Sequence, residues 1–158
     1  MTPRLNPYDF PLLLKQYQDY SQAVSDSGLD KGLLELVKIR ASQINGCANC
    51  LNMHTWEAHK RGESDRRLHL VAAWQEAPVF TERERAALAW TEHLTMVAEK
   101  LAPDDIYAAL DAQFTKGEQF KLTLAINVIN GWNRLCVGFS LFIPSMGWQD
   151  EQQLRVAV

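Results

Sequence analysis

Apolar side chains recur at intervals of three and four residues along almost the whole chain, and this spacing favours helices over strands. We find no convincing alternation of apolar and polar residues, and no long block of valine, isoleucine and threonine, that would indicate a strand. Asn45-Gly46 is a dipeptide typical of hairpin turns, but helical patterns flank it on both sides. The sequence therefore predicts an all-α fold.

Capping residues and helix breakers divide this pattern into about six to eight helices. The expected helices cover, approximately, residues 11–24, 30–45, 47–61, 65–75, 82–100, 103–114 and 116–140. Thr81 and Thr115 each precede a glutamate by three residues, which is the pattern of a capping box. The linkers between the helices are short and no repeat is visible, so we expect a single domain over residues 1–158.

The composition is ordinary for a globular domain, with 47% hydrophobic and 22% charged residues. A net charge of −3 argues against a nucleic-acid partner. The first ten residues lack the apolar core of a secretory signal, and the longest apolar stretch falls far short of the roughly 20 residues that span a bilayer. We therefore expect no membrane partner and a cytoplasmic location, where thiols are kept reduced.

Three cysteines are too few for a disulfide framework, and their odd number calls for another explanation. Cys47 and Cys50 are three residues apart at a predicted helix start, and His54 follows four residues later, so all three share one helix face. Unpaired N–H groups and the helix dipole favour thiolate at such a start. His54 can take or return a proton, or pair with the thiolate. This pattern indicates a two-electron thiol redox centre.

Glu35 lies on the preceding helix, in a mostly apolar stretch twelve positions before Cys47. The short connection at Asn45-Gly46 makes the two helices neighbours, so Glu35 is a candidate partner for His54. Burial there would raise the pKa of its carboxyl and let it act as a base. From spacing alone, a solvated surface glutamate beside Lys38 is an equally good interpretation.

Two other interpretations of the cysteine pair stay open. Two thiolates and an imidazole are legitimate zinc ligands, but a fourth ligand is missing, and His59 is expected on another side of the helix. Alternatively, Cys47 and Cys50 are small buried core residues. Cys136 lies in an apolar helix and is interpreted as such a core residue.

The combination of Glu35, eleven intervening residues, Cys47, Cys50 and His54 resembles the signature of the alkylhydroperoxidase D and carboxymuconolactone decarboxylase superfamily. The stretches 36–47, 54–58 and 86–92 are similar to that superfamily as well, and the core of the resemblance covers about residues 30 to 100. The resemblance implies an all-helical fold that assembles into homo-oligomers, with a dimer, trimer or hexamer all compatible with it. It also implies a thiol peroxidase activity.

In such peroxidases the second cysteine attacks the hydroperoxide and the first resolves the product. Carried over, the resemblance makes Cys50 peroxidatic and Cys47 resolving, and it makes His54 and Glu35 the proton relay that deprotonates Cys50. This chain has Asn49 where the well-studied peroxidase has a histidine, so that part of the relay can only hydrogen-bond here. The decarboxylase branch lacks the cysteine pair, so a decarboxylase activity is less favoured for this chain than a peroxidase activity.

The implied cycle needs no bound metal, flavin or haem, but it needs an external dithiol reductant. By resemblance, that donor is a lipoyl-bearing protein or a thioredoxin-like protein. A redox-sensing or interaction module that uses the same disulfide is an alternative, and a small zinc-binding helical protein is another. The tail over residues 148–158 is expected either to fray or to dock on a partner subunit.

Overall fold

The structure, a computed structural model, describes residues 2–148, and every regular element in that range is helical, as predicted. The α-helices are α1 (Pro11–Ser25), α2 (Lys31–Ile44), α3 (Ala48–Lys60), α4 (Asp65–Leu70), α5 (Glu82–Thr95), α6 (Asp104–Gln113) and α7 (Lys116–Gly138). Three short 3-10 helices accompany them: η1 (Pro7–Asp9), η2 (Val71–Ala73) and η3 (Pro144–Met146).

Side-chain caps account for most of the helix starts. Thr81 and Thr115 form the two predicted capping boxes, each closed by the glutamate three residues later. Asp30 caps α2 by accepting a hydrogen bond of 2.8 Å from the backbone N–H of Leu33. Each cap satisfies backbone donors that a helix start would otherwise leave unpaired.

Two predicted helix ends are wrong. Helix α5 ends at Thr95 rather than near residue 100, because residues 97–100 are exposed and bury no apolar face that would extend the helix. Helix α4 ends at Leu70 and continues as η2, whose tighter 3-10 turn replaces the α-helix expected up to about residue 75.

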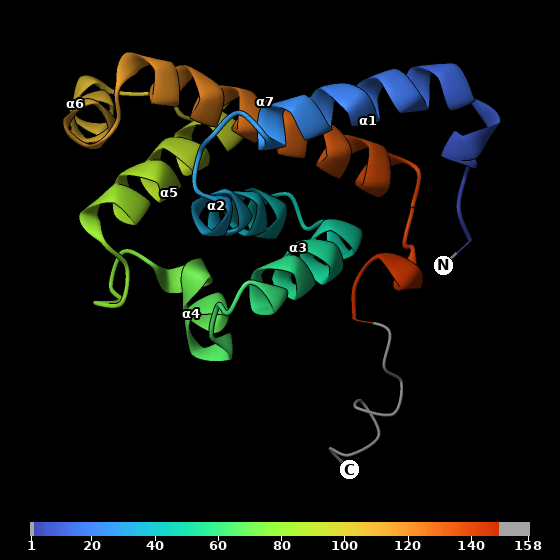
Figure 1. The fold of residues 1–158 in the computed structure, drawn as a ribbon, viewed down its shortest axis with the longest axis horizontal. Helices are drawn as coiled ribbons and strands as arrows, with labels where there is room; N and C mark the ends of the chain where they lie inside the picture. The colour runs from blue at the N-terminus through green and yellow to red at the C-terminus, as the bar shows by residue number, and fades with distance from the viewer. Residues whose placement is uncertain (1, 149–158) are drawn as a thin grey trace, which may run out of the picture.

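Helix α2 is the central element of the fold and packs against α3, α5 and α7 (Figure 1). Helices α7 and α1 run side by side along one edge of the molecule, and α5 with α6 closes one end. Most of α2 is buried, including consecutive residues from 33 to 37, which is expected of a helix surrounded by others. The candidate site residue of α2, Glu35, is therefore held in the interior.

A close approach between α1 and α7 depends on Gly131. The hydroxyl of Tyr17 donates a hydrogen bond of 3.0 Å to the carbonyl of Val128, one helical turn before this glycine. A Cβ atom at Gly131 would clash with the Tyr17 hydroxyl, so only glycine lets the two helices meet here. The Tyr17 ring also packs on Trp132, with the ring centroids 4.6 Å apart.

Trp148 closes the described part of the chain against α3. Its backbone N–H and its indole N–H bond Asn52 and Thr55, and its ring centroid lies 4.6 Å from that of Trp56. The expectation for the tail beyond it falls outside the described residues. Within residues 2–148, none of the helices has the length and apolar character needed to cross a bilayer.

Candidate active site

The turn between α2 and α3 places the cysteine pair at a helix start. Gly46 has a φ of 64°, in the left-handed region, and the N–H of Cys47 then bonds the carbonyl of Ser42 at 3.0 Å. Cys47 becomes the N-cap of α3, and its sulfur accepts the N–H of Cys50 at 3.4 Å. The predicted position of both thiols at a helix N-terminus is confirmed.

The two sulfurs lie 2.6 Å apart, and both side chains are 1% exposed. A disulfide bond is only about 0.5 Å shorter than this separation, so the pair can be oxidised with almost no movement of the helix. Both thiols are free in the structure. The arrangement is that of a reduced dithiol ready to close.

Cys136 of α7 is buried as predicted, but it also lies against the pair. The sulfurs of Cys47, Cys50 and Cys136 all lie within 4.8 Å of one another. Asn49 holds the third thiol, because its amide nitrogen contacts the Cys136 sulfur at 3.5 Å. Sequence reasoning missed this proximity because 87 residues separate Asn49 from Cys136, and no local spacing signals a contact of that range.

Glu35 is 5% exposed, so the interpretation of a solvated surface residue is wrong. Its carboxylate bonds Nδ1 of His54 at 2.7 Å and Nζ of Lys38 at 2.8 Å. Burial alone would raise its pKa, but the hydrogen bond and charge of His54, followed by Lys38, outweigh burial and lower the pKa of Glu35 to about 2. The expected raised pKa is therefore also wrong, and Glu35 is an ionised partner of His54 rather than a base.

The acidities of the thiols differ from the expectation that Cys50 carries the charge. Hydrogen bonds from Cys136, then from Cys50, with a smaller contribution from Asn133, lower the pKa of the Cys47 thiol. The reciprocal contacts with Cys136 and Cys47, together with burial, raise the pKa of the Cys50 thiol. Of the two thiols, Cys47, at the helix N-terminus, is therefore the more acidic.

A buried amide network fixes the α2–α3 turn to α7. Asn45 bonds the side chains of Asn130 and Asn133 at 3.0 and 2.9 Å, and Asn133 bonds the hydroxyl of Ser42 at 3.0 Å. These contacts hold the turn before Cys47 in place, and they give the buried side chains of Asn130 and Asn133 hydrogen-bond partners. Sequence analysis did not assign any of these amides to the site.

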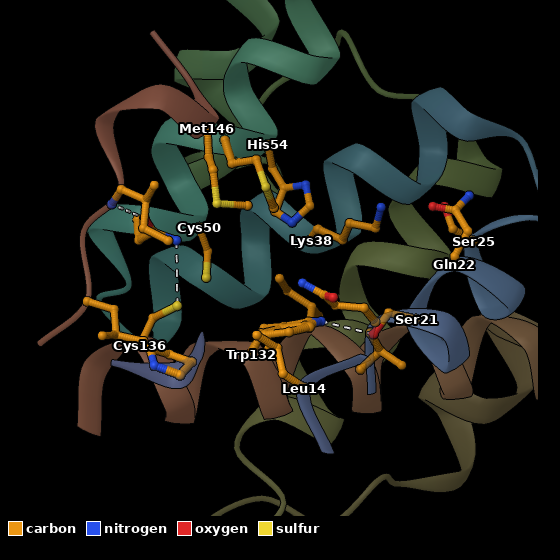
Figure 2. A pocket seen from close by; sticks show the side chains of 18 of the residues that line it. Leu14, Ser21, Gln22, Ser25, Lys38, Cys50, His54, Trp132, Cys136 and Met146 are labelled. Atoms are coloured by element: carbon orange, nitrogen blue, oxygen red, sulfur yellow. Dashed lines mark hydrogen bonds between the residues drawn. The ribbon is translucent and has the colours of Figure 1, made fainter. Parts of the chain in front are cut away.

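A cavity of about 350 Å³ opens over Cys50 and His54 (Figure 2). Its walls are mainly apolar, with Leu14 and Trp132 among them, and its polar groups include Lys38. Cys50 and Cys136 line this cavity, whereas Cys47 does not. A small molecule that enters it can therefore reach Cys50 or Cys136, but not Cys47.

The three sulfurs are the candidate metal ligands of residues 2–148, and no histidine or carboxylate in that range joins them. A closed structural zinc site needs four ligands. His59, the nearest fourth candidate in the sequence, is exposed and lies 3.3 Å from Asp65 instead. The donor set does not fit a structural zinc centre.

Comparison with known proteins identifies the family of the chain and several similar proteins. The sequence model of the Carboxymuconolactone decarboxylase family matches residues 11–93. YdfG of Bacillus subtilis, an uncharacterised protein, is 36% identical over 138 residues, which are 87% of this chain and 94% of that protein.

Solved structures resemble the chain as well. A protein of unknown function from Agrobacterium tumefaciens, provisionally described as the antioxidant defence protein AhpD, is 42% identical, with a TM-score of 0.87 over 90% of this chain and 99% of that one. The debrominase Bmp8 has a TM-score of 0.77 at 16% identity, over 85% of this chain and 73% of that one, which is a likeness of fold alone.

Proposed function

This chain belongs to the carboxymuconolactone decarboxylase family, in its AhpD-like branch, and from that premise we propose that it is a thiol-dependent hydroperoxidase. One observation carries the proposal: Cys50 lines the cavity, and the sulfur of Cys47 lies 2.6 Å behind it. A peroxidatic thiol needs access to its substrate, and a resolving thiol needs access only to the peroxidatic sulfur. Cys50 and Cys47 meet these two needs in that order.

The first half of the cycle oxidises Cys50. His54 takes the proton of the Cys50 thiol, and the Cys50 sulfur attacks the outer oxygen of the hydroperoxide. The O–O bond breaks, the Cys50 sulfur becomes a sulfenic acid, and the alkoxide leaves as an alcohol after taking a proton.

His54 is the group that supplies this proton. Because the Glu35 carboxylate is ionised, it can only accept, so His54 donates Nδ1–H to it. The Nε2 atom is then the one that exchanges a proton with a molecule in the cavity that His54 lines.

The second half closes and reopens the disulfide. The Cys47 thiol attacks the Cys50 sulfur, the S–OH bond breaks, and hydroxide leaves with the thiol proton as water. An external dithiol then attacks Cys50, the sulfur that faces the cavity, and Cys47 departs as thiolate. The lowered pKa of Cys47 makes it the better leaving group. We propose a lipoyl-bearing or thioredoxin-like donor in a reducing compartment such as the cytoplasm.

Steady-state consumption of an organic hydroperoxide tests the proposal. Wild type is assayed with a dihydrolipoyl donor and with a thioredoxin-like donor, beside Cys50→Ser and Cys47→Ser. Turnover by the wild type and its loss in Cys50→Ser is the expected result. Turnover that survives Cys50→Ser would show that the nucleophile is misassigned.

Three further results would overturn the peroxidase assignment itself. Absence of turnover with either donor would remove the claim. A disulfide that forms and is reduced without turnover would indicate a redox sensor. Stoichiometric zinc in the reduced protein would support the metal-binding alternative.

A further inference from the structure

We propose that Cys136 is a second resolving cysteine, which closes a disulfide with Cys50 on the cavity side when Cys47 does not. The inference rests on the proposed function, because it concerns the fate of Cys50 after oxidation. It assigns a chemical role to a residue that the sequence pattern presented only as core.

The first argument is access. Cys50 and Cys136 line the same cavity, and their side chains point toward each other (Figure 2). Their sulfurs lie within 4.8 Å of one another, a separation that side-chain rotation can close to a disulfide. Cys47 does not line the cavity, and its sulfur lies 2.6 Å from that of Cys50. The peroxidatic sulfur therefore has two thiols close to it, and one of them, Cys136, also lines the cavity.

The second argument is that Cys136 is held in place by a specific contact. Asn49, one residue before Cys50, reaches across to α7 with its amide nitrogen 3.5 Å from the Cys136 sulfur. The side-chain oxygen Oδ1 of Asn49 accepts a hydrogen bond of 2.7 Å from the N–H of Ile143, which fixes the chain after α7 over the cluster. The N–H of Leu141 also bonds the carbonyl of Cys136 at 2.8 Å. Together these contacts hold the C-terminal end of α7, and with it the Cys136 side chain, against the start of α3.

The chemistry balances with the groups present. Peroxide oxidises Cys50 to a sulfenic acid, and the Cys136 thiol attacks that sulfur. The S–OH bond breaks, the S–S bond forms, and the hydroxide leaves with the Cys136 proton as water. A second resolving thiol shortens the life of the sulfenic acid, and so limits its irreversible oxidation to sulfinic acid.

The test removes the first resolving thiol and asks what happens to Cys50. Cys47→Ser keeps an N-cap residue at the start of α3, so the helix is retained. Cys47→Ser/Cys136→Ser is the matched control, and Cys47→Ser/Cys136→Ala replaces it if serine at this buried site unfolds the chain. Each reduced variant is treated with one equivalent of an organic hydroperoxide, and its disulfides and sulfenic acid are mapped by mass spectrometry.

Cys47→Ser is expected to lose two hydrogens and yield the Cys50–Cys136 disulfide, whereas the double variant is expected to stop at a sulfenic acid on Cys50. A stable sulfenic acid in Cys47→Ser, with Cys136 still free, would overturn the inference while leaving the peroxidase proposal intact.

A probe that needs no peroxide separates the two proposals further. A small aromatic disulfide that enters the cavity forms a mixed disulfide on Cys50 and releases one thiolate. Attack by Cys136 then releases a second thiolate in Cys47→Ser but not in the double variant. One thiolate with a persistent mixed disulfide in Cys47→Ser refutes the role of Cys136, even if the wild type proves inert to hydroperoxides.

Discussion

Replacing Glu35 by glutamine removes a buried charge while keeping its shape, and this change is expected to make stability less dependent on pH. The folded protein holds this carboxylate between His54 and Lys38. Lowering the pKa from its ordinary 4.5 to about 2 corresponds to about 3 kcal/mol of stability, because each tenfold change in proton affinity is worth about 1.4 kcal/mol.

The sign follows from the direction of the pKa. A carboxyl whose pKa is lower in the folded state contributes its full stabilisation above the ordinary pKa and loses it as pH falls toward about 2. Glutamine resembles the protonated acid, so the free energy of unfolding of Glu35→Gln is expected to be about 3 kcal/mol lower than that of the wild type at neutral pH. This difference in unfolding free energy is expected to narrow steadily below about pH 5.

Urea unfolding of wild type and variant across this pH range measures that gap. Glu57→Gln is the matched control, because Glu57 forms an i,i+3 pair with Lys60 at 2.6 Å on the exposed surface. Its removal is expected to change stability by no more than about 1 kcal/mol. If the loss of unfolding free energy in Glu35→Gln is as small as in Glu57→Gln, or does not change with pH, then His54 and Lys38 do not stabilise the Glu35 carboxylate as described.

The remaining predictions concern packing, thiol acidity and assembly. Gly131→Ala is expected to lower the free energy of unfolding by about 1–3 kcal/mol, because its Cβ atom clashes with the Tyr17 hydroxyl, and Gly131→Ala/Tyr17→Phe is expected to recover part of that loss. A melting temperature of Gly131→Ala equal to that of the wild type would contradict this packing. Asn133→Ala is expected to raise the pKa of the Cys47 thiol, read from thiolate absorbance against pH, and an unaltered curve would count against this hydrogen bond. Self-association is expected through the apolar face of α1, where Leu13 is 68% exposed, so Leu13→Glu should sediment as a smaller species; a monomeric wild type would contradict this.

The helical architecture was predictable because local signals determine it. The capping boxes at Thr81 and Thr115 are set by residues within a few positions, and each is where the sequence placed it. The end of α5 was not predictable in this way. Its position depends on which residues find a partner surface to bury, and that is a tertiary property.

The features of the site also separate into those that local spacing determines and those that depend on tertiary packing. Cys47, Cys50 and His54 lie on one helix, so their spacing predicted their shared face. The ionised state of Glu35 was beyond the sequence, because it depends on the distances to His54 and Lys38 rather than on the apolar neighbours along the chain. Cys136 reaches the pair only through the packing of α7 on α3.

The most direct test of the central claim is a single turnover without any reductant. Reduced protein is mixed with one equivalent of an organic hydroperoxide, and free thiols and alcohol are counted. The account predicts that two thiols are lost for each molecule of alcohol formed, with Cys50 in the resulting disulfide. Alcohol formation without thiol loss, or an unreacted hydroperoxide beside intact thiols, would contradict it.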